Sequence, residues 1–225
     1  MNNLKKTLLL LLLPTLPAGC HFYRAPFPSP GSYYYLNQDK DLFAVGRVAV
    51  VELDNDSSYP AISADVTKAL FQAFQKKQIF GLTLIPQSDP AWRSLLFELD
   101  PAQPTKNMAF KLPPTYTLEQ LLAIRKALKS DAVMLGTVTE YQPYPHMAVG
   151  LRLKLIDLND GQLLWALEQI WNSADRTTEY RIKKYFRRQL RSGFAPLKEE
   201  LVVVSPVEFI RFVAYETAET IRPNY

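Results

Sequence analysis

Side chains that could act as nucleophiles, general bases or metal ligands are few and scattered in this sequence. The two histidines are His21 and His146, and neither has carboxylates or thiols at a spacing suited to a shared metal ion. Glu52 and Asp54 end one apolar run on the same side of a strand; they form either an acid pair or, as we expect, caps of the following turn. No glycine-rich phosphate loop and no Gly-x-Ser-x-Gly motif occurs. The sequence therefore predicts a protein that is not an enzyme and uses no cofactor or metal.

Cys20 is the one cysteine of the chain, and it follows an apolar amino-terminal segment. Two lysines precede six consecutive leucines, and the small residues Ala18 and Gly19 come directly before the cysteine. A basic start, an apolar middle and a small-residue cleavage site are the three parts of a secretory signal. The leucine run is too short to cross a bilayer as a helix, which takes roughly 20 apolar residues. We therefore expect residues 1–19 to be a signal peptide.

The position of Cys20 favours lipid attachment. The segment resembles the signals of bacterial lipoproteins, which are cut before a cysteine that receives a diacylglycerol on sulfur and often a fatty acid such as palmitate on its amine. Pro17 stands where such signals usually have leucine, so an ordinary secretory signal is the alternative. With no second cysteine, Cys20 has no intrachain disulfide to form. We expect both acyl groups on Cys20, which would hold the protein stably on a membrane.

Charge and length constrain the chain beyond the signal peptide. Removal of the signal, which carries two of the 26 basic residues against 22 acidic ones, lowers the net charge from +4 to +2. Such a value neither favours nor excludes an anionic partner. Residues 20–43 are rich in proline, serine and tyrosine and are predicted to be a lipidated cysteine with an extended tether, although the tyrosines at 33–35 could instead pack on the domain. Residues 44–225 are long enough for one domain with a sizeable core.

Apolar patterns in residues 44–225 predict strands alternating with helices. Strands are expected at 45–53, 80–85, 131–141, 149–155 and 162–171, with a hairpin turn at Asn159–Gly161. Helices are expected at 60–77, 92–98, 177–191 and after capping boxes at Thr117 and Ser205. Six prolines make the rest of 86–116 irregular. The fold class is therefore α/β (α+β), a single mixed sheet of about five strands with helices packed on it.

Three segments carry a resemblance to one family. RVAVVELDN at 47–55, SDAVMLGTVTEY at 130–141 and LRLKLIDLNDGQLLW at 151–165 are similar to patterns of the CsgG-type curli-secretion lipoproteins and of LpoB and TolB amino-terminal domains. The matching residues are core and turn residues: Asp131, Gly136, Asp157, Gly161 and Trp165. The resemblance implies a mixed sheet covered by helices, on the periplasmic side of an outer membrane. The residue after the cysteine is His21 and not aspartate, which favours the outer membrane over the inner one.

Channel subunits of this family add membrane-spanning hairpins to the domain. Two segments of this chain offer room for such insertions, 86–116 and 172–204. Prolines interrupt the first and basic residues crowd the second, so neither alternates apolar and polar residues as lipid-facing strands do. We expect no pore strands.

The basic segment 177–191 is the strongest surface feature. Its candidates for contact with a partner or an anionic surface are Arg181, Lys183, Lys184, Arg187, Arg188 and Arg191. Interleaved aromatic and basic residues can bind nucleic acid, but a periplasmic protein rarely meets any. Anionic lipid headgroups or an acidic protein suit the segment better, and a merely solvated helix face is the alternative.

Together these features predict an outer-membrane-anchored periplasmic lipoprotein that is a non-enzymatic binding or assembly module of the cell envelope. Its partners would be the membrane, through the lipid, and another envelope protein, with no nucleic acid and with a homo-oligomer left open. The alternative is a subunit of an oligomeric secretion or envelope complex. Trp165 and Trp171 are expected in the core rather than on a ligand platform.

Overall fold

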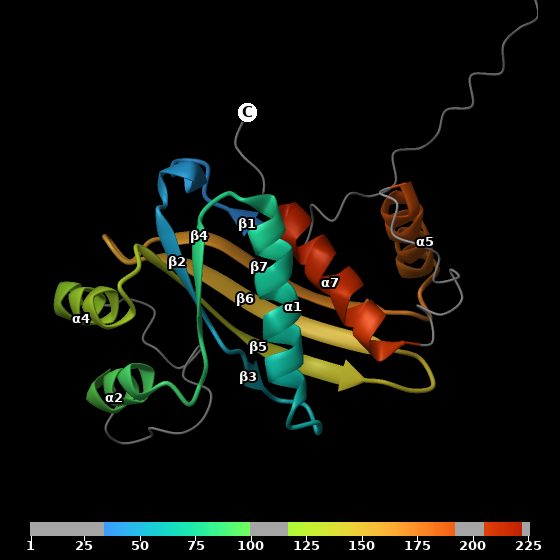
Figure 1. Ribbon diagram of the computed structural model, residues 1–225, viewed down its shortest axis with the longest axis horizontal. Coiled ribbons are helices and arrows are strands. Elements are labelled where there is room, and N and C mark those ends of the chain that lie inside the picture. Colours follow the sequence, from blue (N-terminus) through green and yellow to red (C-terminus); the bar gives the residue numbers. More distant parts are fainter. Residues whose placement is uncertain (1–33, 100–116, 192–204, 222–225) are drawn as a thin grey trace, which may run out of the picture.

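The computed structural model describes residues 34–99, 117–191 and 205–221 (Figure 1). The predicted signal peptide, Cys20 and residues 21–33 lie outside the described residues. The described chain forms a mixed sheet of seven strands with five α-helices and one short 3-10 helix. The α+β class is confirmed, and the sheet has two strands more than the five expected.

The sheet combines a parallel part and an antiparallel part. Its strands are β1 (Tyr34–Leu36), β2 (Arg47–Val51), β3 (Asp54–Asn55), β4 (Gly81–Ile85), β5 (Ala132–Gln142), β6 (Ala148–Asp157) and β7 (Leu163–Asn172). The order is β1-β7-β6-β5-β2-β4, with β3 beside β5. β2 pairs in parallel with β4 and β5, whereas β5, β6, β7 and β1 pair antiparallel. The two strands missing from the prediction, β1 and β3, are too short to show an alternation.

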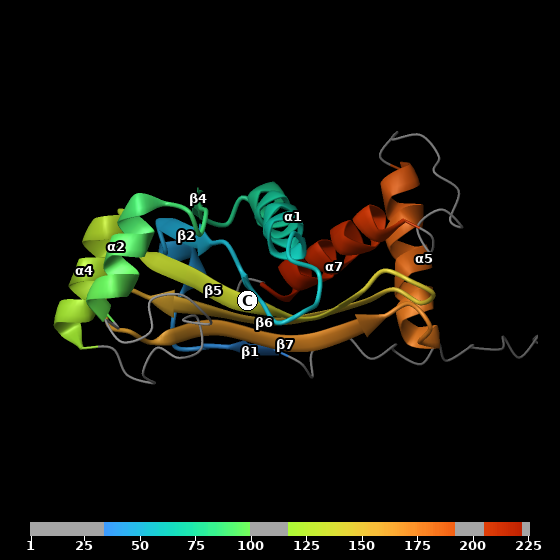
Figure 2. The ribbon, with the colours of Figure 1, turned by 90° about the horizontal axis from the view of Figure 1, so that it is seen from below.

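Helices cover the two faces of the sheet differently. They are η2 (Leu42–Ala44), α1 (Ile62–Lys77), α2 (Pro90–Leu99), α4 (Leu118–Leu128), α5 (Arg176–Arg191) and α7 (Pro206–Thr220). α1 and α7 lie side by side over one face, and α5 stands at one end of the sheet (Figures 1 and 2). α2 and α4 lie at the opposite end. No helix in the described ranges has the length and apolar character needed to cross a membrane.

Alternating residues of the central strands supply two apolar cores. Val48 and Val50 of β2 belong to the core under α1 and α7, while Ala49 and Val51 belong to the core under α2 and α4. A strand covered on both faces is apolar throughout, which explains the valine-rich sequence of β2. Trp165 and Trp171 lie in the first core with 0% and 1% of their surfaces exposed, as predicted.

β1 and η2 correct the predicted extent of the tether. Residues 34–36 pair with β7, and the Asn37 N–H donates to the Leu164 carbonyl oxygen at 2.9 Å. Within β1, Tyr34 packs against the first core and Tyr35 is half exposed, as the two-residue period of a strand requires. The folded part therefore includes residues 34–43, which the sequence analysis assigned to the tether.

One of the two predicted capping boxes is complete. The Gln120 N–H donates to Thr117 Oγ1 at 3.2 Å, and the Thr117 N–H donates to Gln120 Oε1 at 2.9 Å. Ser205 Oγ accepts the Glu208 N–H at 3.5 Å, but the Glu208 carboxylate pairs with Arg211. Ser205 is therefore an N-cap without the reciprocal bond.

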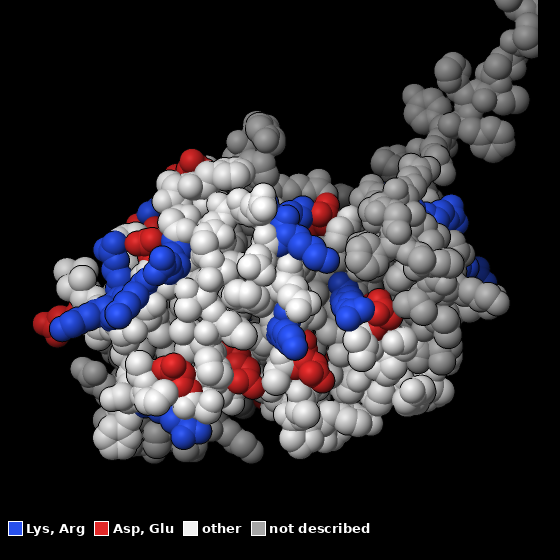
Figure 3. All heavy atoms as spheres, in the orientation of Figure 1, with Lys and Arg blue, Asp and Glu red and all other residues white. Residues whose placement is uncertain are grey.

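The face formed by α1 and α7 has mixed charge. Figure 3 shows basic and acidic side chains interspersed over it. Lys77 of α1 pairs with Glu219 of α7, which joins the two helices across their contact. The described residues of this face therefore form no extended surface of one sign.

Candidate functional site

The residues that carry the family resemblance have structural roles. Asp131 Oδ2 accepts the Arg47 N–H at 3.0 Å, and Asp131 Oδ1 lies 3.2 Å from Arg125 Nη2. A Cβ at Gly136 would lie 2.6 Å from the Arg152 carbonyl oxygen, so a larger residue requires the strand pair to shift. Asp131 therefore fixes the start of β2, and Gly136 allows β5 and β6 to approach closely. Neither residue brings reactive groups together.

Asp157 and Gly161 shape the predicted turn between β6 and β7. Asp157 Oδ1 accepts the Asn159 N–H at 2.8 Å, and Gly161 has a φ of 75°, the left-handed region that favours glycine. Lys40 Nζ lies 3.2 Å from Asp157 Oδ2 and also donates to Asp160. The bond to Asp160 raises the pKa of Lys40 and lowers the pKa of Asp160. The cluster ties the start of the fold to this turn.

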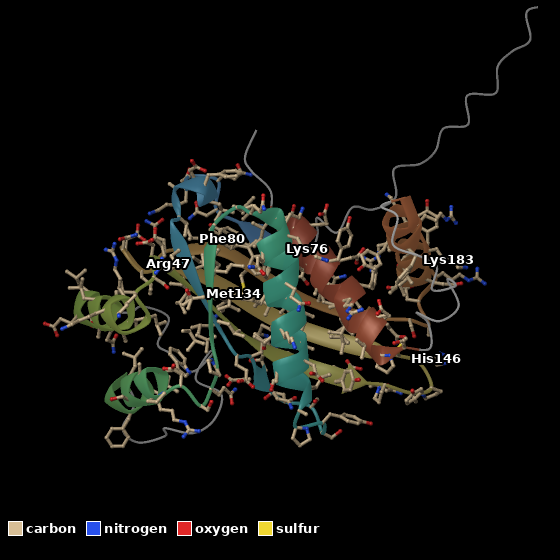
Figure 4. All side chains as sticks on the ribbon, viewed as in Figure 1. Arg47, Lys76, Phe80, Met134, His146 and Lys183 are labelled. Atoms are coloured by element: carbon tan, nitrogen blue, oxygen red, sulfur yellow. The ribbon has the colours of Figure 1, made fainter. Side chains whose placement is uncertain are left out.

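The acidic pair and the loop histidine are not assembled into a catalytic site. Glu52 Oε2 accepts the Gln87 N–H at 3.0 Å, and Gln87 Nε2 donates to Asp54 Oδ1 at 3.4 Å. The two acids thus hold the loop after β4, and a capping role in the turn that follows β2 stays a prediction. His146 is exposed in the β5–β6 hairpin (Figure 4). Within the described ranges, no group of three or more His, Cys, Asp or Glu side chains is placed to hold a metal ion.

A groove of about 540 Å³ lies between η2, the end of α1 and the start of β4, beside Phe80 in Figure 4. It is lined by Phe43, Val45, Gly46, Gln75, Gln78, Ile79, Phe80, Gly81 and Leu82. The described lining offers apolar surface and two glutamine amides, and no carboxylate, imidazole or thiol. Its chemistry is limited to apolar contact and hydrogen bonding.

α5 presents a basic outer side and an apolar inner side. Ile182 and Phe186 are buried, whereas Arg176, Lys184 and Arg187 are exposed. Side chains three, four or seven positions apart share one side of a helix, so this split follows from the sequence period. Lys183 pairs with Glu179 at 2.6 Å and lies on the side of α5 that points away from α7 (Figure 4). Arg188 and Arg191 belong to α5, but their side chains lie outside the described residues.

Aromatic rings attach α5 to α7. The Tyr185 ring centroid lies 4.8 Å from that of Tyr215 and 5.8 Å from that of Phe212. Phe186 stacks edge-on against Tyr185 at 4.9 Å. Such ring pairs stabilise a contact beyond the area that they bury. The inner side of α5 is thus held by α7, which leaves the basic side facing outward.

Arg181 differs from the outward-facing basic residues. Its Nη1 lies 3.1 Å from Glu216 Oε2, and the two side chains are only 20% and 12% exposed. Trp171 Nε1 donates to the same oxygen at 2.9 Å. Burial raises the pKa of Glu216, while the nearby Arg181 charge and the Trp171 bond act in the opposite direction. Arg181 therefore links α5 to α7 and β7, and contact of its guanidinium with a partner stays a prediction.

The face of the sheet opposite α1 and α7 holds a second surface, which the sequence analysis did not identify. Ile170 of β7 is 58% exposed and Tyr35 of β1 is 50% exposed on this outer face. Along β7, Glu168 lies between Ile170 and the residue opposite Tyr35, and it pairs with Arg152 of β6 at 2.6 Å. No described helix lies below β7 and β1 in Figure 2, because α2 and α4 cover the far end of the sheet. We call these four residues the outer-face patch.

The signal for the outer-face patch was present in the β7 sequence. Trp165, Leu167 and Trp171 point into the first core, so the residues between them point outward. Glu168 and Ile170 are two of these outward residues. The alternation shows which side chains share a face, but it does not show that no described helix covers them.

Comparison with known proteins gives structural neighbours alone. No family model matches the chain, and no curated protein sequence matches it. The chain is similar to the dodecameric PelC of Paraburkholderia phytofirmans, with 14% identity and a TM-score of 0.41 over 65% of this chain and 85% of that chain. It is also similar to lipoprotein GNA1162 of Neisseria meningitidis, with 16% identity and a TM-score of 0.39 over 67% and 99% of the two chains.

A third neighbour is the LpoB carboxy-terminal domain of Salmonella enterica. It shares 16% identity with a TM-score of 0.37, over 56% of this chain and 82% of that chain. The resemblance to CsgG, LpoB and TolB amino-terminal domains stays an expectation.

Proposed function

We propose that this chain is a lipid-anchored periplasmic protein of a bacterial outer membrane and acts as a non-enzymatic binding or assembly module of the cell envelope. Acyl groups on Cys20 would supply the anchor. The observation that supports the binding role is the outer-face patch, where aromatic, aliphatic and charged side chains share one rigid surface.

The chemistry of the outer-face patch suits a protein partner. Tyrosine and arginine are enriched among residues that dominate protein interfaces, and the patch contains Tyr35 and Arg152. The Arg152–Glu168 pair is 40% and 65% exposed, so it contributes at most about 1 kcal/mol to the fold and can exchange partners readily. Ile170 adds apolar area beside these charges. The partner we infer is another envelope protein with a mixed apolar and polar surface.

A subunit of an oligomeric envelope complex is the second candidate. β4 is the last strand of the sheet, and no described strand pairs with its outer edge. Leu84, next to the last residue of β4, is 41% exposed. An edge strand with an apolar residue can pair with a strand of another chain. This candidate predicts contact between copies through β4.

Site-specific photo-crosslinking tests the binding role. A photoreactive amino acid at Ile170 in the full chain, expressed in a Gram-negative bacterium, is expected to give a discrete adduct with an envelope protein. Lys76, exposed on α1, is the matched control position and is expected to give none.

The mass of the adduct shows what the outer-face patch contacts. An adduct of twice the chain mass assigns the patch to self-association rather than to another envelope protein, whereas contact through β4 predicts an adduct of that mass from a photoreactive residue at Leu84. Equal adducts from Ile170 and Lys76, or no adduct from Ile170, would contradict a binding role for the patch.

A further inference from the structure

We propose that the α5 end of the molecule docks on anionic phospholipid headgroups of the membrane that holds the acyl groups of Cys20. This inference rests on the anchor in the proposed function and adds an orientation to it. The α5 end comprises the outer side of α5 and the hairpin at residues 143–147 that joins β5 to β6.

The charge at the α5 end complements an anionic surface. Arg176, Lys184 and Arg187 are exposed along the outer side of α5, and Lys183 lies beside them. Each Lys or Arg brought near an anionic membrane increases the affinity for it about fivefold, which corresponds to roughly 1 kcal/mol of binding free energy. A row of such residues on one helix therefore gives a strong, salt-sensitive attraction.

The acidic groups at this end are engaged in local bonds. The Thr177 hydroxyl donates to Asp175 at the start of α5, and so do the backbone N–H groups of Thr177 and Thr178. These bonds lower the pKa of Asp175, the hydroxyl bond most. The bond from Lys183 lowers the pKa of Glu179. Both carboxylates therefore stay ionised and locally paired, and the outer side of α5 carries an excess of positive charge.

The β5–β6 hairpin adds an aromatic side chain to the same end. Ala148 pairs with Asn172, so the hairpin lies next to the end of β7 where α5 begins. Tyr144 at its tip is 64% exposed. Figure 4 shows His146 of this hairpin and Lys183 of α5 at the same end of the molecule. Tyrosine suits the boundary between headgroups and acyl chains, because it has an apolar ring and a polar hydroxyl.

The register of β1 favours this end over the other. β1 runs antiparallel to β7, with Tyr34 opposite Leu167 and Leu36 opposite Trp165. The chain therefore enters the sheet from the α5 side. From Leu167 to the end of β7 at Asn172 is about 17 Å of strand. Residues 21–33, which separate Cys20 from β1, can span at most about 45 Å when fully extended, so the anchor can hold the α5 end at the membrane.

The opposite end of the molecule is less suited to a membrane. α4 also exposes basic residues there, but Arg125 pairs with Asp131, and Glu119 lies in the first turn of α4. β1 runs from Tyr34 to Leu36 toward the α4 end of the sheet, so the chain does not enter the sheet there. The charge at the α4 end is therefore mixed, and the chain enters the sheet from the far side.

Energy transfer from the protein to the membrane tests this orientation. The full lipoprotein carries a fluorophore on a new cysteine at Ala174 beside α5, or at Glu119 on α4 as the control position; both are exposed. It is reconstituted in vesicles that carry an acceptor lipid, with or without phosphatidylglycerol. We expect stronger transfer from position 174 than from position 119 in vesicles with phosphatidylglycerol, and loss of the difference in high salt.

Charge reversal identifies the responsible residues. A variant with Arg176→Glu, Lys184→Glu and Arg187→Glu is expected to lose the difference in transfer between the two positions. The matched control, with Lys68→Glu, Lys76→Glu and Lys126→Glu, makes the same change in net charge at exposed residues away from α5 and is expected to keep it. Thermal unfolding of both variants shows whether the fold is retained.

Each outcome has one meaning. Equal transfer from positions 174 and 119, or a difference that survives the α5 reversal, would overturn the inference. A further outcome is that the α5 reversal leaves the energy transfer unchanged and instead removes the photo-crosslinked adduct formed in cells. In that case α5 binds an acidic protein, and the inference is wrong. Flotation of the vesicles tests the lipid anchor separately. Protein that does not float with the vesicles contradicts the proposed function. Protein that floats but shows equal transfer from positions 174 and 119 contradicts this inference alone.

Discussion

Replacement of Trp165 by alanine is expected to lower the free energy of unfolding by about 4 kcal/mol. The Trp165 side chain is 0% exposed, lies 6.3 Å from Phe74 between ring centroids, and donates from Nε1 to Thr220 Oγ1 at 3.1 Å. Alanine would leave a cavity between β7, α1 and α7, because these elements are held apart by their other contacts. It would also remove the indole N–H that donates to Thr220 Oγ1, although the Thr220 hydroxyl keeps its own bond to the Thr217 carbonyl oxygen. The melting temperature should fall by roughly 10 °C for a domain of this size.

Two companion variants separate the causes of this effect. Trp165→Phe keeps most of the apolar volume and loses the bond to Thr220, so it should cost about 1–2 kcal/mol. Phe97→Ala removes a ring that is 60% exposed, and it should stay within about 0.5 kcal/mol of the wild type. If Trp165→Ala were as stable as Phe97→Ala in chemical denaturation, Trp165 would not be a core residue.

Replacement of Arg181 by methionine is expected to lower the free energy of unfolding by about 3 kcal/mol at neutral pH. This is the lower end of the range for breaking a buried ion pair, because both side chains keep some exposure. The methionine keeps the apolar stem but removes the guanidinium from the Glu216 carboxylate, which keeps its bond from the Trp171 indole N–H. The exposed Arg125–Asp131 pair provides the control, because Arg125→Met should change the free energy of unfolding by no more than about 0.5 kcal/mol. Equal effects of the two substitutions would show that Arg181 does not fix α5.

The pH dependence of this pair has a definite sign. The pKa of Glu216 in the folded state lies above its ordinary 4.5, chiefly because of burial. The folded state therefore favours the protonated carboxyl, so this contribution to stability is complete below the unfolded pKa and is lost as the pH rises through the folded pKa. Arg181 opposes the shift, so Arg181→Met raises the pKa of Glu216 further and should be more destabilising at neutral than at acidic pH. Glu216→Gln should reduce the fall in melting temperature that accompanies a rise in pH above 4.5.

Local pattern was sufficient for most of the fold. The structure confirms three predictions that depend on residues close in sequence: the valine-rich strand β2, the apolar stripe of α1 and the Thr117 capping box. The turn at Asn159–Gly161 is confirmed for the same reason, since its bonds are formed within five residues.

The features that sequence analysis missed depend on distant partners. β1 is a strand because β7 offers an edge to it, and residues 34–36 are too few to show a period. Arg181 turns inward because Glu216, on another helix, lies below it. Ile170 is exposed because no described helix crosses the outer face of β7. That follows from strand order and helix placement rather than from the alternation in β7.

α5 therefore combines two separate roles in one basic segment. Its inner side is fixed by the rings of Tyr185 and Tyr215 and by Arg181 with Glu216, while Lys184 and Arg187 face outward. Substitution of the outward residues should change interactions with little loss of stability, and substitution of Arg181 should do the opposite. The basic composition of the segment alone did not separate these groups.

Acylation and membrane fractionation of the Cys20→Ser full chain test the anchor most directly. The wild type is expected to incorporate a palmitate analogue and to stay with the outer membrane after a high-salt wash, which screens the charges of α5. Cys20→Ser is expected to lack the label and to leave the outer-membrane fraction in that wash. Equal labelling of the two proteins, together with unchanged fractionation after the wash, would contradict a lipid-anchored envelope protein.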